Sequence, residues 1–443
     1  MWRCCVFALL AVRSAGSTVV QTKVGLIRGV LADDGDYSMY LGIPYADVDE
    51  NTPFGDSTPH PPFQGIYHAN DDSVKCPQRD KFSQNIEGTL DCLRLHVYVP
   101  NIRSNRSLPV LVWIHGGAFE RGDGSRFLYG PKFLVKHSII LVSLNYRLGP
   151  YGFLCLGTPE APGNQGLKDQ LLALRWIKRN IQAFGGDPDR ITVMGESAGA
   201  ISVELHILSK FEKLFAAAII QSGSVNAPGA ITTVEANDSQ ISPDKIVPIL
   251  GGFNSNEELV TYTDQPQTFL TERFFRNFLE LSFEVNDEMV ETVHKFYLGE
   301  AEISEAVKSN LIDFLSDFKR YYPVQNSLLN FLNKGADVYQ YMFSYNGTRN
   351  YAIGDNIIFY CLYTTYSPPT PSIIMKCVID TNSFRKPVPK PSDLIPVDWV
   401  PLSEPERFYL DMDVDLALKI KPFETRLAFW DSFFKTYEDR ELF

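Results

Sequence analysis

The chain has 443 residues, of which 44% are hydrophobic and 21% charged, and its formal net charge is −12. This composition is ordinary for a folded protein with a sizeable core, and it argues against a disordered, collagen-like or coiled-coil chain. Because no basic stretch offsets the acidic excess, we expect no nucleic-acid partner.

The N-terminal segment has the shape of a secretory signal peptide. Arg3 precedes an apolar run at 4–12, and small residues follow at 14–17. This pattern predicts that residues 1–16 are a cleaved signal and that the product is secreted to the extracellular space. The run is too short to cross a bilayer, and no other stretch reaches the roughly 20 apolar residues of a membrane helix, so no membrane span is expected. Residues 17–443 are predicted to form one domain.

Strand and helix patterns alternate in the first half of this domain. The apolar spacing predicts strands at 19–29, 93–99, 109–114, 139–144, 191–194 and 216–220, and helices at 167–181 and after residue 197. Such alternation is typical of the α/β class, in which a central, mostly parallel sheet is flanked by helices.

The second half has a less regular pattern. A polar break at 237–243 precedes a strand at 247–252, and the stretch 256–335 is mainly helical. A further strand is predicted at 338–343, a proline-rich loop at 366–399, and an amphipathic helix at 422–438.

Cysteines and sequons fit an oxidising compartment. Five of the seven cysteines lie beyond residue 16, and some of them are expected to pair. N-x-S/T sequons at Asn105, Asn237 and Asn346 are candidate glycosylation sites. Close Cys/His groups of the kind that bind metals do not occur in the sequence, and we expect no metal or cofactor.

Two glycine-containing motifs follow predicted strands. Gly195-Glu196-Ser197-Ala198-Gly199 fits the G-x-S-x-G elbow, in which a serine is presented on a tight strand-to-helix turn and side chains at both glycine positions would clash. Ser197 is therefore the candidate nucleophile. The second motif, 113–119, contains His115-Gly116-Gly117-Ala118 after the strand at 109–114, and its small residues allow backbone N–H groups to approach an oxyanion.

With these motifs the chain resembles the type-B carboxylesterases, the family that includes the cholinesterases and the insect carboxyl/choline esterases. The stretches that carry the resemblance are 42–46, 91–98, 145–147, 163–170, 184–188 and 221–224, together with the two motifs. The resemblance is nearly continuous from 19 to 224 and patchy beyond. It implies an α/β-hydrolase fold and a serine carboxylesterase that hydrolyses small-molecule carboxylic esters without a cofactor.

The resemblance also assigns roles to residues. It implies that the N–H groups of Gly117, Ala118 and Ala198 form the oxyanion hole, and that Cys76 pairs with Cys92. The family's acidic triad member lies in a G-x-N-x-x-E stretch, which matches 252–257 here and makes Glu257 the candidate.

The loop between the paired cysteines bears on the substrate. Cholinesterases place a tryptophan there that binds a quaternary ammonium group by cation–π attraction, and the loop at 76–92 has none. Uncharged esters are therefore expected rather than choline esters.

The triad histidine is the point of departure from the family. Ile353 stands where the late H-G-[DE] motif has its histidine, and His294 is the last histidine of the chain. Helical spacing around His294 favours an ordinary helix position, while His115 and His206 match structural positions of the family. Internal segments are also expected to be missing near 230–244 and 352–354.

Two hypotheses follow from these observations. The first is a secreted ester hydrolase whose turnover is impaired by the missing motif histidine. The second is a catalytically silent binding or adhesion-type protein on the same scaffold. The complete serine motif favours the first hypothesis, and Ile353 favours the second.

Overall fold

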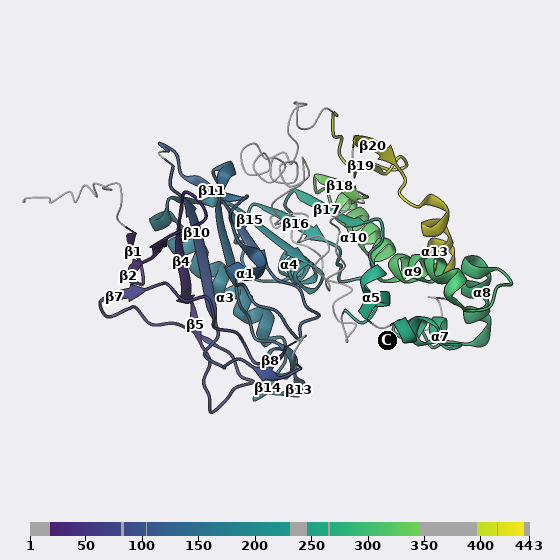
Figure 1. Ribbon diagram of the computed structural model, residues 1–443, viewed down its shortest axis with the longest axis horizontal. Helices are drawn as coiled ribbons and strands as arrows, with labels where there is room; N and C mark the ends of the chain where they lie inside the picture. Colours follow the sequence, from purple (N-terminus) through teal and green to yellow (C-terminus); the bar gives the residue numbers. More distant parts are fainter. Residues whose placement is uncertain are drawn as a thin grey trace, which may run out of the picture.

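The computed structural model describes residues 18–80, 84–102, 104–230, 246–264, 266–344, 397–413 and 415–437. Its centre is an 11-stranded sheet with the order β20-β19-β18-β17-β16-β15-β11-β12-β10-β4-β3 (Figure 1). The strands are β3 (Val30–Leu31), β4 (Tyr37–Pro44), β10 (Arg94–Pro100), β11 (Leu108–Ile114), β12 (Ile140–Leu144), β15 (Gly186–Glu196), β16 (Ala217–Gln221), β17 (Ile249–Asn254), β18 (Val338–Phe343), β19 (Phe408–Met412) and β20 (Leu416–Ile420).

Strand directions confirm the predicted α/β class. The run from β12 to β19 is parallel throughout, and antiparallel pairs occur only toward the two edges of this sheet. The central strands are buried on both faces, which explains their nearly continuous apolar sequences. In β11, Val110, Val112 and Ile114 join the core on one face, whereas Leu111 and Trp113 join the core on the other.

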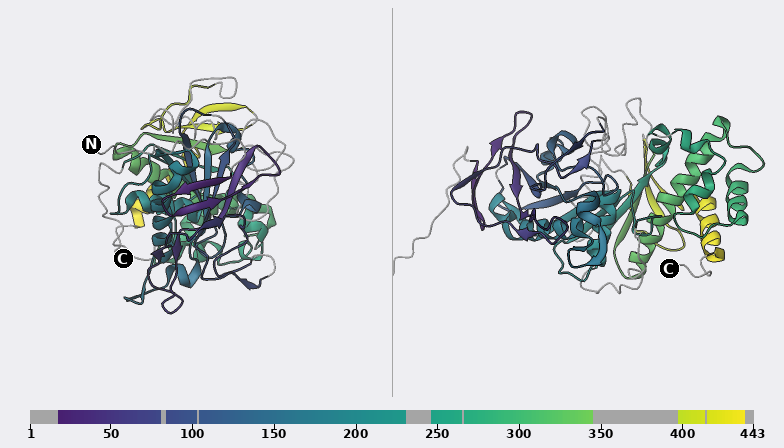
Figure 2. Two further views of the ribbon diagram at one scale, coloured as in Figure 1. Left: turned by 90° about the vertical axis from the view of Figure 1, so that its left-hand side faces the viewer. Right: turned by 90° about the horizontal axis from the view of Figure 1, so that it is seen from below.

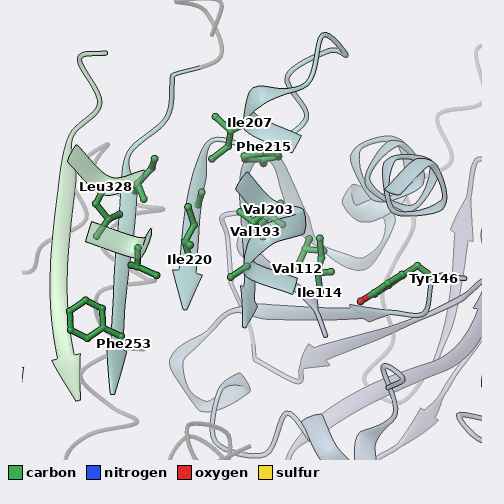
Figure 3. Packing of buried hydrophobic residues seen from close by; sticks show 14 of the residues in the cluster. Val112, Ile114, Tyr146, Val193, Val203, Ile207, Phe215, Ile220, Phe253 and Leu328 are labelled. Carbon is green, nitrogen blue, oxygen red and sulfur yellow. The ribbon is translucent and has the colours of Figure 1, made fainter. Parts of the chain in front are cut away.

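Three helices cover the face that carries Val112. They are α3 (Gln165–Asn180), α4 (Ala198–Leu208) and α10 (Tyr322–Asn333). Figure 3 shows Val203 of α4 beside Val193 of β15. The contact of α10 with β17 is close, because a Cβ on Gly251 would lie 2.5 Å from a methyl carbon of Leu328.

A further group of helices extends the molecule beyond β17. They are α5 (Leu259–Asp264), α6 (Pro266–Phe269), α7 (Phe274–Leu279), α8 (Asp287–Leu298), α9 (Lys308–Ser316) and α13 (Glu424–Tyr437), and a π-helical stretch, Asp317–Tyr321, joins α9 to α10. In two views α7, α8 and α13 lie at the end of the molecule that is remote from β4 (Figures 1 and 2). Two short helices, α1 (Arg126–Tyr129) and α2 (Gly149–Phe153), lie in the first half.

Short strands complete the described structure. A three-stranded sheet contains β1 (Val19–Thr22), β2 (Gly25–Arg28) and β7 (Ile66–His68). Two-stranded sheets contain β5 (Ala46–Asp47) with β6 (Thr58–Pro59), β8 (Gln78–Arg79) with β9 (Ile86–Glu87), and β13 (Cys155–Thr158) with β14 (Ala161–Pro162). In the described part of the chain, no helix has both the length and the apolar character of a membrane span.

Most predicted elements occur, with some corrections. The single strand predicted at 19–29 is wrong: the chain forms the hairpin β1–β2, which turns where Gly25 has φ +122°. The strand predicted at 191–194 begins five residues earlier, and β4, β19 and β20 were not predicted. The predicted signal peptide, the break at 237–243, the segments expected to be missing near 230–244 and 352–354, and most of the proline-rich loop lie outside the described residues.

A buried carboxyl group on α4 gives the fold a pH dependence. Glu204 is 2% exposed and accepts hydrogen bonds from the Val225 N–H (2.9 Å) and the Ser327 hydroxyl. Burial raises the pKa of Glu204 from 4.5 to about 7. Between these two values the folded chain binds more protons than the unfolded chain, so the free energy of unfolding falls as pH rises.

We expect Glu204→Gln to remove this loss of stability at higher pH while it preserves the shape of the side chain. The shift corresponds to roughly 3 kcal/mol between pH 4.5 and 7. Urea unfolding at pH 5 and pH 8 should therefore show that the variant gains stability relative to wild type at the higher pH. Glu212→Gln is the control, because Arg175 lowers the pKa of Glu212 to about 2 and that carboxylate stays ionised in this range. An identical pH dependence in wild type and Glu204→Gln would contradict the assignment.

Candidate active site

Ser197 lies in a sharp turn between the end of β15 and the start of α4. Its backbone has φ 53° and ψ −122°, an unfavourable conformation for a residue with a side chain. Its N–H donates to Gln221 O on β16 (2.9 Å), and its carbonyl accepts from the Ile201 N–H in α4 (3.0 Å). The turn is therefore fixed on both sides, and Ser197 is half-buried at the carboxyl edge of the sheet.

The glycines of the elbow allow this turn because the backbone passes very close to them. A Cβ on Gly195 would lie 2.3 Å from the backbone of Gly199, and a Cβ on Gly199 would lie 2.1 Å from Ile114 O at the end of β11. These distances are impossible for real side chains, so the steric reason given for both glycines in the motif holds in the structure.

The loop that follows β11 approaches Ser197 directly. A Cβ on Gly116 would lie 3.2 Å from Ser197 Cβ. The next residues, Gly117, Ala118 and Phe119, all have positive φ (108°, 56° and 60°). Positive φ is uncommon for residues with side chains such as Ala118 and Phe119, so the loop is tightly turned here. Ala198, the first residue of α4, adjoins Ser197 in the chain, and Gly117 and Ala118 directly follow Gly116, the loop residue that packs against Ser197.

Glu257 follows β17, two strands from β15. Its Oε1 accepts a hydrogen bond from the Ser222 hydroxyl (2.6 Å) and one from the Asn254 N–H (2.6 Å). Ser222 follows β16 and is next to Gly223, where a Cβ would lie 2.3 Å from Ser197 O. The carboxylate is thus connected to the serine elbow through Ser222, a contact that the sequence analysis missed.

The residue after Glu257 carries a buried carboxylate in a different environment. Glu258 is 1% exposed and pairs with Arg320 (3.0 Å) and Lys319 (3.2 Å). Burial raises the pKa of Glu258, but the two cations outweigh it and hold the pKa at about 2. Burial raises the pKa of Glu257, and the charge of Arg320 opposes this shift.

Arg320 also donates to the Ser222 carbonyl oxygen (3.0 Å). Its guanidinium therefore contacts both Glu258 and Ser222, and Ser222 in turn binds Glu257. Because both cations are committed to Glu258, that carboxylate is a structural ion pair. Glu257 remains the candidate acid.

The seven histidines all lie within the described residues, and none of them forms a hydrogen bond with Ser197 in that part of the chain. His115 is buried, stacks on Tyr146 and donates from Nδ1 to Gly116 O (2.8 Å). His206 donates to Gln170 Oε1 (2.9 Å). His294 packs against Phe275 on the remote side of the molecule, where Figure 1 shows α8 far from α4. Ile353 lies outside the described residues.

The predicted cysteines and glycosylation sequons lie apart from the serine in the sequence. The Cys76–Cys92 disulfide implied by the resemblance is present. Cys155 is an exposed free cysteine, and Asn105 is exposed. Asn237 and Asn346 lie outside the described residues. The described His, Cys, Asp and Glu side chains form no group of three or more that could hold a metal ion.

Comparisons with known proteins show what the sequence is similar to. The sequence model of the Carboxylesterase family matches residues 16–242 and 234–430. The chain is 42% identical over 280 residues to an acetylcholinesterase of Bungarus fasciatus, 42% over 226 residues to esterase B1 of Culex pipiens, and 41% over 243 residues to a bile salt-activated lipase of Mus musculus. These matches cover 59%, 49% and 52% of the chain but only 46%, 42% and 40% of the relatives. The chain therefore matches less than half the length of each of these relatives.

Proposed function

Because the chain belongs to the carboxylesterase family, we propose that it is a serine carboxylic ester hydrolase that accepts the acyl group on Ser197. The observation that carries the proposal is the contact between two separate loops: Gly116 packs against Ser197, which lies in a strained turn at the edge of the sheet. A nucleophile and a set of backbone donors at one point are the minimum that acyl transfer requires.

In the proposed reaction, Ser197 Oγ attacks the ester carbonyl carbon and forms a tetrahedral intermediate. The N–H groups of Gly117, Ala118 and Ala198 donate to its negative oxygen, and each such donor is worth about 3–4 kcal/mol in the transition state. The C–O bond to the leaving alcohol then breaks, and the alcohol departs with a proton. Water attacks the acyl-serine, which releases the acid and regenerates the hydroxyl.

The proton from Ser197 Oγ has no imidazole acceptor among the described residues, and we propose that water accepts it. Loss of the histidine from such a triad reduces kcat by about a millionfold. Deacylation suffers in the same way, because it also requires a base to activate water. We therefore propose slow acylation of Ser197 by reactive esters and still slower release of the acyl group.

Several features support an extracellular protein that acts on uncharged esters. The tryptophan-free loop closed by the Cys76–Cys92 disulfide favours uncharged over choline esters. A disulfide fits an oxidising compartment, as does the exposed Asn105 sequon, and residues 1–16 supply the proposed secretory signal. We propose glycosylation at Asn105, Asn237 and Asn346.

The alternative proposal is a silent binding protein on the same scaffold. The observation that favours it is the set of histidine positions described above, since none of them forms a hydrogen bond with Ser197. On this alternative, esters or a protein partner would bind without acyl transfer. The intact serine motif and its two close-packed glycines argue for the hydrolase.

Burst kinetics with a short-chain aryl ester distinguish the two proposals. We expect wild type to release about one equivalent of aryl alcohol per chain and then turn over slowly, because acylation precedes a slower deacylation. Ser197→Ala should release no burst while it retains the same unfolding midpoint. Identical traces for wild type and Ser197→Ala would rule out the hydrolase proposal and favour the binding protein.

A further inference from the structure

The side chain of Gln78 joins two loops that are distant in sequence. Gln78 lies in β8, inside the loop closed by the Cys76–Cys92 disulfide. Its Oε1 accepts from the Gly122 N–H (2.8 Å), and its Nε2 donates to Gly122 O (3.0 Å). One amide side chain thus satisfies both backbone groups of Gly122, and Nε2 donates its second hydrogen to Cys76 O (3.2 Å). Both hydrogens and the oxygen of this amide are used.

Gly122 packs tightly against the candidate oxyanion loop. It has φ +114°, and a Cβ there would lie 2.5 Å from His115 Nδ1 and 2.9 Å from Gly116 O. The loop between Gly117 and Gly122 is closed by hydrogen bonds from the Glu120 and Arg121 N–H groups to Gly117 O (3.0 and 3.1 Å). Because Gly122 packs this closely against His115 and Gly116, a shift of Gly122 toward them must move this loop.

The support of Gln78 is itself rigid. The disulfide anchors the start of its loop, and the Thr89 N–H donates to Lys75 O (2.9 Å) across that loop. Gly88 lies against the same backbone, since a Cβ on it would be 2.4 Å from Cys76 O. Gln78 therefore lies in a hairpin that is held by a disulfide, a backbone hydrogen bond and close backbone packing.

We propose that Gln78 is a positioning residue for acyl transfer: it fixes Gly122 and thereby holds the Gly117 and Ala118 amides at the distance from Ser197 that an oxyanion requires. This inference rests on the proposed function for its chemical consequence. The mechanical part, that Gln78 orders the loop 116–122, does not depend on catalysis. Misplacement of such groups by about 1 Å costs on the order of a hundredfold in rate.

Gln78→Met tests the proposal, because methionine has a similar length but can neither donate to nor accept from Gly122 as the amide does. Gln64→Met, at an exposed position, is the matched control. Amide hydrogen exchange of peptides that cover 115–122 should accelerate roughly tenfold in Gln78→Met and stay unchanged in Gln64→Met. Gln78→Glu keeps the acceptor for the Gly122 N–H and loses both donors, so it should fall between wild type and Gln78→Met, and it serves in place of Gln78→Met if that variant does not fold.

Acylation by the aryl ester supplies the second readout. Positioning predicts that the limiting rate constant of acylation falls between tenfold and a hundredfold, while the dissociation constant of the initial ester complex is unchanged. Unchanged exchange at 115–122 in the folded variants would overturn the proposal, and so would faster exchange with an unchanged acylation rate. If exchange accelerates but wild type is never acylated, Gln78 still orders the loop, whereas the hydrolase proposal and the catalytic consequence of Gln78 both fail.

Discussion

Replacing Ile353 with histidine should raise the turnover of a short-chain aryl ester by at least about a thousandfold, because a triad without its histidine loses about a millionfold in kcat. Ile353 stands where the resembled family carries the general base. Glu257 accepts a hydrogen bond from Ser222 next to the serine elbow, and the acid of a triad orients the imidazole that contacts it. Steady-state kcat and kcat/KM of Ile353→His against wild type give the measurement.

The matched controls for this gain are Ile353→Gln and the double variant Ile353→His/Ser197→Ala. Glutamine is polar but cannot act as a base near neutral pH, and the double variant has the imidazole without the nucleophile. Neither should exceed wild type. A folded Ile353→His chain with wild-type turnover, although its Ser197 is still acylated, would show that position 353 does not serve the triad.

Replacing Arg147 with alanine should lower the free energy of unfolding by about 3–5 kcal/mol, the range for breaking a buried ion pair from one side. Arg147 and Asp169 are both fully buried, and the guanidinium meets the carboxylate through two bonds of 2.7 Å each. The Arg147 guanidinium also donates to Pro53 O and Gly55 O. The variant would leave a buried carboxylate without its cation and two carbonyl groups without that donor.

Arg175→Ala is the control for this prediction. Arg175 forms a similar two-bond pair with Glu212, but both side chains are partly accessible to water, so the expected loss is below about 1 kcal/mol. Urea unfolding of the three chains measures the difference. Equal losses for the buried and the exposed pair would contradict the account of Arg147.

The sequence predicts those parts of the fold that depend on local pattern. The central strands β11, β12 and β16 have apolar runs that suit burial on both faces, and they occur within a residue or two of the predicted bounds. Strand β15 was predicted too short because its first residues, 186–190, are polar and lack the apolar pattern of a buried strand. In the structure Gly186 pairs with Leu108 of β11, and such pairing depends on a distant partner. β19 and β20 were missed for the same reason, because each is stabilised by its neighbours at the sheet edge.

In the candidate site, too, the features set by local sequence could be predicted, and those that depend on distant partners could not. The turn at Ser197 and the glycine loop at 116–117 could be predicted, because steric limits on backbone geometry leave a strong trace in sequence. The contacts of Ser222 with Glu257 and of Gln78 with Gly122 could not, since they join residues 35 and 44 positions apart. Side-chain hydrogen bonds of this kind have no periodicity, although the stretch 221–224 was already among those that resemble the family.

The most direct test of the central claim is the mass of the intact chain after exposure to an excess of an uncharged aryl ester. Acid quenching during the slow deacylation phase preserves any acyl-enzyme, and peptide mapping then locates the group. The account predicts one added acyl group per chain, on Ser197, and no added mass on Ser197→Ala. An unmodified wild-type chain, or an acyl group on any residue other than Ser197, would contradict it.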